Sequence, residues 1–159
     1  MGKIADVQEV TLTKLVPYVN NAKIHSEEQV TMIASSIREF GFLSPVLIDR
    51  DFNIIAGHGR VMAAKSNGMT DIPCCFVEGL TAEQRAAYIL ADNRLSEFGK
   101  WDMKLVSLEM EKLAEKSFNI DVVSFDLPEL SLPDSNSYYG DERERTMKTY
   151  NLDISQKGT

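Results

Sequence analysis

Apolar and polar positions follow strand-like and helix-like patterns in turn along most of this chain. Short apolar runs, typical of strands, occur at residues 7–12, 45–48, 54–56 and 72–77. Helical spacing of apolar side chains is found at Val30, Ile33, Ile37 and Phe40, and again over residues 58–67. Strands alternating with helices predict an α/β architecture, and the turn at residues 50–53 predicts a hairpin.

Helix boundaries carry recognisable capping residues. A serine or threonine followed three residues later by glutamine predicts a capping box at a helix N-terminus. Two such pairs occur, Ser26 with Gln29 and Thr81 with Gln84. Gly41 fits the position just after the first helix, and Asp102 is expected to cap a later one.

Composition changes after an apolar patch at residues 122–125. Residues 132–137 resemble a linker, and residues 141–145 form a mixed-charge run. We therefore expect an α/β domain over residues 1–98, a helical extension packed on it over 99–130, and a linker or flexible tail over 131–159. Within that tail, Tyr138 and Tyr139 either dock a partner or are simply exposed.

The charge balance limits the kinds of partner. Hydrophobic residues make up 43% of the 159 residues and charged residues 26%, as in ordinary soluble proteins. A net charge of −7 argues against a broad electrostatic grip on nucleic acid. No segment approaches the length of a membrane span, so we expect a cytoplasmic protein without a membrane partner.

The two cysteines, Cys74 and Cys75, are neighbours in an expected strand. Adjacent strand residues point to opposite faces, so the pair suits core packing in a reducing compartment better than a disulfide or a shared metal. His25 and His58 are the only imidazoles, and their spacing does not match a zinc motif.

The stretch Gly57-His58-Gly59-Arg60 is the strongest candidate for chemistry. It joins a strand to a helix, which leaves the N–H groups of Gly59, Arg60 and Val61 at a helix N-terminus, where the macrodipole favours anions. Arg60 adds a planar fork suited to phosphate oxygens. The first hypothesis is a phosphate site, most simply for a nucleotide; the alternative is an ordinary turn with a solvated arginine. Neither a dinucleotide fingerprint nor a Walker motif is present.

A second polar group, Asp92-Asn93-Arg94, lies within an otherwise apolar helix. In a nucleotide site, Asp92 would hold Mg²⁺, Asn93 would orient a terminal phosphate or a water, and Arg94 would neutralise phosphate charge. The alternative is that polar residues simply collect near the end of a helix.

Several motifs in order resemble the ParB and sulfiredoxin superfamily. They are the loop Pro17 to Lys23, residues 34–46, Gly57-His58-Gly59-Arg60 and Ile89 to Arg94. The resemblance covers roughly residues 5–130. With Lys100-Trp101-Asp102, it is closest to ParB-like domains of phages and mobile elements, often beside DNA methyltransferases and in part labelled nucleases.

This resemblance implies a small mixed sheet with packed helices and a helical C-terminal part. It implies a nucleotide, CTP or ATP/ADP, with possible Mg²⁺, and phosphate contacts from Gly57, His58, Gly59, Arg60 and Arg94, with Asn21 and Lys23 from the first loop. Asp92 would serve the metal, and Asn93, with Asp92, would be catalytic if the protein is an enzyme. DNA reached through a partner or further domain, a DNA methyltransferase and a second copy of the chain are the implied partners.

The chain also departs from the family pattern. His58 stands where partition ParB proteins have glutamate, Gly59 replaces an arginine, and Asp92 is one methylene shorter than the family's glutamate. Gly57 occupies the place of sulfiredoxin's catalytic cysteine, so sulfinic acid reductase activity is not expected. No helix-turn-helix reader follows Phe98.

Three function classes remain after these observations. The favoured one is a nucleotide-responsive module of a phage or bacterial DNA-modification, partition or transcription-related system. The second is an enzyme on the same fold: a nucleotide hydrolase, a small-molecule kinase or a nuclease. The third is a protein-interaction adaptor whose phosphate loop is vestigial.

Overall fold

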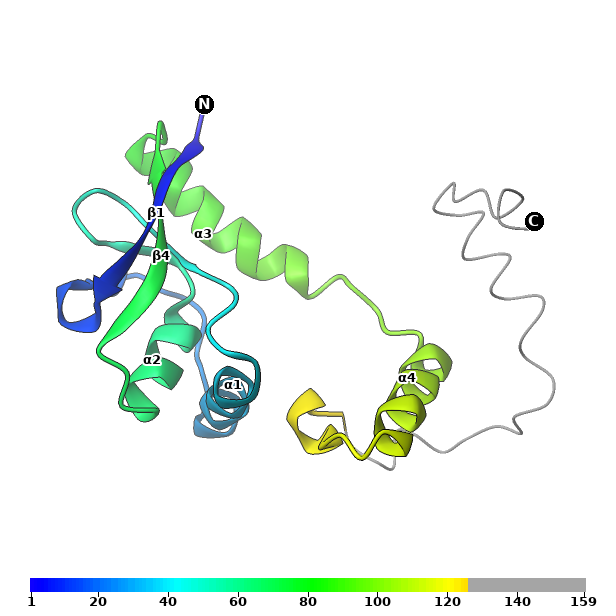
Figure 1. The fold of residues 1–159 in the computed structure, drawn as a ribbon. Coiled ribbons are helices and arrows are strands. Elements are labelled where there is room, and N and C mark those ends of the chain that lie inside the picture. The colour runs from blue at the N-terminus through cyan, green and yellow to red at the C-terminus, as the bar shows by residue number, and fades with distance from the viewer. Residues whose placement is uncertain (126–159) are drawn as a thin grey trace, which may run out of the picture.

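The computed structural model describes residues 1–125 and shows a mixed sheet covered by helices (Figure 1). The expected linker or tail, including Tyr138 and Tyr139, lies outside the described residues. In chain order the elements are β1 (Lys3–Thr11), the 3₁₀ turn η1 (Leu12–Lys14), α1 (Glu27–Phe40), β2 (Val46–Ile48), β3 (Ile54–Ala56), α2 (His58–Ser66), β4 (Asp71–Glu78), α3 (Ala82–Ser96), α4 (Met103–Glu115) and the 3₁₀ turn η2 (Ile120–Val123).

The four strands form one sheet in the order β1-β4-β2-β3. β4 pairs antiparallel with β1 and parallel with β2, while β2 and β3 form the expected antiparallel hairpin. The sheet is therefore mixed, and the predicted α/β (α+β) fold class is confirmed. All four strands occur where apolar runs predicted them, although β1 begins four residues before the expected start at residue 7.

The core lies between the sheet and α2. Ile72, Cys74 and Phe76 alternate along one face of β4 and are buried against Val46 and Val61, among others. Cys75 points to the other face and is buried too, and both cysteines are free thiols. Burial raises the pKa of Cys74 to about 11, which suits the predicted packing role of this thiol.

Most helix ends match the capping prediction. Thr81 and Gln84 form the complete capping box, and the Asp102 carboxylate accepts two backbone N–H groups at the start of α4. Gly41 ends α1 with φ of 87°, a conformation that favours glycine. The first box forms only in part: the Ser26 hydroxyl accepts from the Gln29 amide, whereas the Gln29 side chain pairs with His25 at 3.0 Å.

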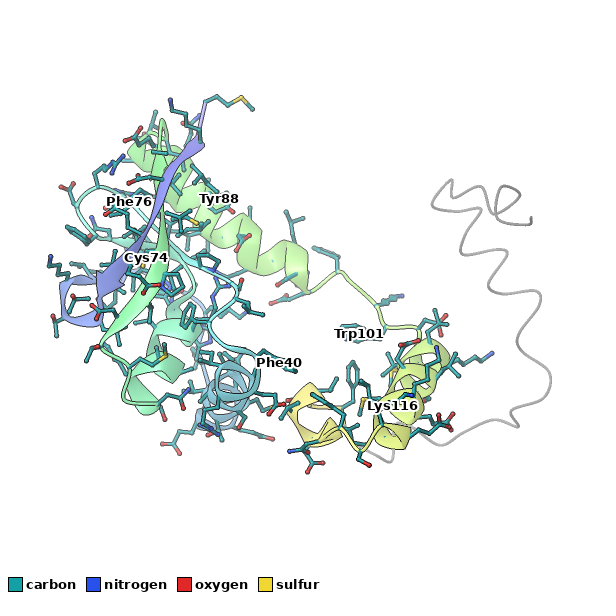
Figure 2. All side chains as sticks on the ribbon, viewed as in Figure 1. Phe40, Cys74, Phe76, Tyr88, Trp101 and Lys116 are labelled. Carbon is teal, nitrogen blue, oxygen red and sulfur yellow. The ribbon has the colours of Figure 1, made fainter. Side chains whose placement is uncertain are left out.

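The C-terminal elements return toward α1. Figure 1 shows α3 extending away from the sheet, η2 lying near α1, and α4 beyond η2. Phe40 of α1 stacks on Phe118 at a ring separation of 6.2 Å, and Figure 2 shows Phe40 on the side of α1 that faces this segment. Trp101 meets Phe125 edge to face at 5.0 Å. Among the described helices, none has the length and apolar character needed to cross a bilayer.

Candidate functional site

The candidate site is the junction between β3 and α2. Gly57 caps α2 in a left-handed conformation with φ of 108°, and its carbonyl accepts the Val61 N–H at 3.0 Å. The Val61 N–H is therefore already bonded within the helix. This corrects the prediction that Gly59, Arg60 and Val61 supply the unpaired N–H groups. The N–H groups left at the helix start are those of His58, Gly59 and Arg60, and no side chain of the described residues caps the helix.

The two glycines of the junction serve different purposes. A Cβ on Gly57 would lie 2.9 Å from the Arg60 Nη2 atom, and the positive φ of Gly57 already disfavours a side chain. A Cβ on Gly59 would lie 3.0 Å from His25 Nδ1 and 3.1 Å from Ile33 Cδ1. Gly57 therefore permits the turn and leaves space for the guanidinium of Arg60. Gly59 permits α2 to pack closely on α1.

Arg60 folds back over the helix start. Its Nη1 donates to the Ser44 hydroxyl, and its Nε and Nη2 lie over Gly57. Burial lowers the pKa of Arg60 from its usual value, and the charge of Asp92 on α3 opposes this shift. The guanidinium is thus partly stripped of water and lies within electrostatic range of Asp92. Sequence reasoning missed the Ser44 contact, because no spacing rule links these two residues.

The residues of the second polar group point in different directions. The Asp92 carboxylate accepts from the Tyr88 hydroxyl at 3.4 Å. Asn93 donates its side-chain N–H to the Ile89 carbonyl at 2.8 Å, within its own helix. Arg94 pairs with Glu97 at 2.5 Å and lies over the Phe98 ring at 4.6 Å. The charge of Asp92 thus acts on Arg60, whereas Arg94 is engaged near the C-terminal end of α3.

The loop of residues 18–23 is connected to the site by hydrogen bonds that its backbone N–H groups donate. The Tyr18 N–H donates to His58 Nε2 at 3.1 Å, and the Tyr18 carbonyl accepts from the Asn21 N–H at 3.1 Å. The Asn21 side chain in turn accepts from the Lys23 N–H at 3.3 Å. His58 is half-buried, and burial, followed by the charge of His25, lowers its pKa. The described loop is thus tied to the first residue of α2.

A groove of about 510 Å³ adjoins the helix start. Arg60 and Ser44 form part of its wall, and α1, residues 41–44 and η2 form the rest. Its surface is mainly apolar, with contributions from Met32, Ile33, Phe40, Leu43, Val122 and Val123. Within residues 1–125, no three His, Cys, Asp or Glu side chains cluster closely enough to hold a metal by themselves.

The family model covers both candidate groups. The model of the ParB N-terminal domain family matches residues 2–94. The ParB-like nuclease domain-containing protein YnaK of Escherichia coli (strain K12) is 51% identical over 74 residues, which are 46% of this chain and 85% of YnaK. The probable chromosome-partitioning protein ParB of Rickettsia bellii (strain RML369-C) is 31% identical over 88 residues, which are 55% of this chain and 30% of that protein.

A solved structure shares the fold. It is the C-terminally truncated chromosome-partitioning protein ParB from Caulobacter crescentus, complexed with CTP-gamma-S. The two chains are 18% identical with a TM-score of 0.67, and the match covers 94% of this chain and 88% of the other. At this identity the likeness concerns the fold alone. Because the family model spans more than half of the sequence, this chain belongs to the ParB N-terminal domain family.

Proposed function

We propose that this protein is a nucleotide-binding module that holds phosphates at the start of α2. The observation that carries the proposal is the helix N-terminus without a side-chain cap, beneath a partly desolvated arginine. Three backbone N–H groups, the positive end of the helix and a guanidinium together favour a multiply charged anion. The related Caulobacter protein is complexed with CTP-gamma-S, which supports CTP as the first nucleotide to test, followed by ATP and ADP.

The groove beside Arg60 suits the rest of the ligand. Small-molecule sites usually enclose about 300–1,000 Å³ with mostly apolar walls and a few polar groups. The groove has that size and character, and Arg60 in its wall connects it to the phosphate-binding amides. We place the nucleoside in this groove and the phosphates on His58, Gly59 and Arg60. Asn21 and Lys23 would approach the phosphates from the neighbouring loop.

Mg²⁺ would bind together with the phosphates. Mg²⁺ is commonly held by one or two carboxylates plus substrate phosphates and waters. Asp92 is the carboxylate whose charge reaches Arg60, so it fits as the protein ligand. Asn93 would have to exchange its bond to the Ile89 carbonyl for a phosphate or water, and Arg94 its ion pair with Glu97. The roles of Asn93 and Arg94 therefore require rearrangement of their side chains on α3.

The cellular role is proposed from the family resemblance and from the net charge of the chain. We propose a phage or bacterial DNA-modification, partition or transcription-related system, with DNA reached through a partner or a further domain. A DNA methyltransferase and a second copy of this chain are the partners to test. The acidic net charge supports DNA contact through a partner, because this chain lacks the broad positive charge of a DNA-coating protein.

The test is calorimetric titration with CTP, ATP and ADP, each with and without Mg²⁺, combined with backbone NMR. Binding with the largest shift changes at the amides of His58, Gly59 and Arg60 is the expected result. Absence of binding by all three nucleotides would refute the proposal and favour the adaptor class. Shift changes confined to other elements would place the ligand elsewhere.

An enzymatic role is the second candidate, and the name of YnaK, which includes a nuclease domain, favours testing it. The charge of Asp92, which acts on Arg60, would also suit a water-activating carboxylate beside a phosphate. Phosphate release and nucleic-acid cleavage should be measured with the wild type and Asp92→Asn. If the wild type turns over a substrate and Asp92→Asn does not, the protein is an enzyme. If the wild type binds nucleotide but shows no turnover, the binding-module proposal is favoured.

A further inference from the structure

We propose that His58 is a positioning residue: its neutral ring holds the loop of residues 18–23 beside the helix start, and protonation of the ring releases that loop. The proposal deepens the nucleotide site above and rests on it for its effect on binding. It assigns the side chain of His58 to the loop and leaves only its backbone N–H for phosphate. The observation that carries it is the 3.1 Å bond from the Tyr18 N–H to His58 Nε2.

The direction of this bond fixes the protonation state of the ring. A backbone N–H can only donate, so Nε2 must present a lone pair and the ring proton must lie on Nδ1. An imidazolium has N–H groups at both nitrogens and cannot accept this bond. Tyr18 is 40 positions away in sequence, so the bond joins two separate parts of the fold.

The bond lies in the middle of a segment that is anchored at both ends. At one end, Val16 exchanges backbone bonds with Phe52 and Ile54, both at 2.9 Å. At the other, Ser26 caps α1. Between these anchors, the bond to His58 holds Tyr18 beside α2. The Tyr18 carbonyl in turn accepts a hydrogen bond from the Asn21 N–H. Loss of the His58 acceptor would therefore free the part of the loop that carries Asn21 and Lys23.

Burial of the ring, and after it the charge of His25, favours the neutral form of His58. His25, which precedes α1 and lies against Gly59, disfavours a second positive charge nearby. Arg60 on the same helix and Lys23 in the loop are cations, and Asp92 on α3 acts on Arg60. Because burial, followed by the charge of His25, lowers the pKa of His58 from its usual value, the Tyr18 bond is intact at neutral pH and is lost as the pH falls through that lowered pKa.

Positioning and direct ligation predict opposite responses to acid. A ring that contacts phosphate directly would bind it more tightly once protonated, because the imidazolium adds a charge and a donor. A ring that holds the loop would instead weaken binding on protonation, because Asn21 and Lys23 lose their place. Whether protonation of His58 strengthens or weakens nucleotide binding therefore distinguishes the two roles.

The first experiment needs no nucleotide. NMR follows the imidazole nitrogens of His58 and the Tyr18 amide across about pH 5 to 7.5, which spans the ordinary histidine range. We expect the amide shift and its hydrogen-exchange protection to change with the same midpoint as His58. In His25→Gln, this shared midpoint should move upward, because the charge of His25 is one of the causes that lower the pKa of His58. A Tyr18 amide that ignores the titration of His58 would overturn the proposal.

The second experiment measures nucleotide affinity over the same range for the wild type, His58→Ala and His58→Gln. Glutamine offers an acceptor with similar reach and no titration. We expect His58→Ala to weaken binding at neutral pH by roughly threefold to tenfold, the worth of one hydrogen bond. His58→Gln should bind nucleotide almost as tightly as the wild type at neutral pH. Its affinity should lack the decrease in acid that protonation of His58 causes in the wild type.

The outcomes distinguish this inference from the nucleotide proposal. If no nucleotide binds but Tyr18 and His58 titrate together, the positioning role stands and the nucleotide proposal falls. Tighter wild-type binding in acid, absent from His58→Gln, would show direct ligation and overturn the positioning role. Equal affinity of wild type and His58→Ala at neutral pH would also overturn it.

Discussion

Alanine in place of Arg60 removes the guanidinium that lies over Gly57 at the start of α2. Hydrogen bonds to charged groups contribute roughly 1.5–3 kcal/mol each, so loss of one phosphate contact should raise Kd between about tenfold and about 150-fold. The partial desolvation of the guanidinium in the free protein supports the upper half of this range, because less water must be removed on binding.

The substitution also has a structural cost that must be separated from binding. Arg60→Ala removes the bond to the Ser44 hydroxyl, whose net contribution to folding is about 0.5–1.5 kcal/mol. Thermal unfolding without nucleotide measures this cost, and calorimetry on the folded variant measures Kd. Arg60→Lys keeps the charge but loses the planar fork, so its affinity should fall between those of the wild type and alanine.

Lys65→Ala is the matched control. Lys65 is an exposed lysine in the last turn of the same helix, so the variant has the same net charge as Arg60→Ala. We expect its Kd to stay within about twofold of the wild type, because exposed charges at this separation are screened by salt. Equal losses in both variants would indicate a general charge effect, and an unchanged Kd in folded Arg60→Ala would refute the site.

Three further predictions test the surroundings of the site. Gly59→Ala should destabilise the fold by about 1–3 kcal/mol in a denaturant titration, because its Cβ would press on α1. Gly99→Ala is the control and should have little effect, because the nearest atom to its Cβ would lie 3.8 Å away. Cys74 should resist a disulfide reagent in the native protein at about pH 8, because burial and a pKa of about 11 keep it as a protonated thiol; rapid modification before unfolding would contradict this placement. Asp92→Asn should reduce the gain in nucleotide affinity on adding Mg²⁺, and an undiminished gain would remove Asp92 from the metal site.

Local rules predicted the elements well because the relevant interactions lie close in sequence. Thr81 reaches an amide three residues away, and Gly41 adopts a positive φ at the end of α1, which favours glycine. The hairpin likewise follows from a short turn between two apolar runs. Such features depend on a few neighbouring residues, so the sequence alone determines them.

The candidate site was only partly predictable because its side chains depend on the packing of distant elements. Spacing located the helix start, but the bond from Tyr18 to His58 and the Arg60 contact with Ser44 arise only when separate segments meet. For Arg94, the glutamate three positions later was a visible local signal for the ion pair that the structure shows. The roles proposed for Asp92, Asn93, Asn21 and Lys23 stay predictions.

The central place of β4 has a consequence for synthesis on the ribosome. β1 is made first, but its partner strand ends at Glu78, so their register, which joins Lys3 to Glu78, is established only after most of the domain has been translated. The hairpin of β2 and β3 and the two helices around it can associate earlier, because their contacts are closer in sequence. Until β4 arrives, β1 has no pairing edge and Val10, which is buried in the folded protein, stays exposed, so this interval is the one most open to aggregation or chaperone capture.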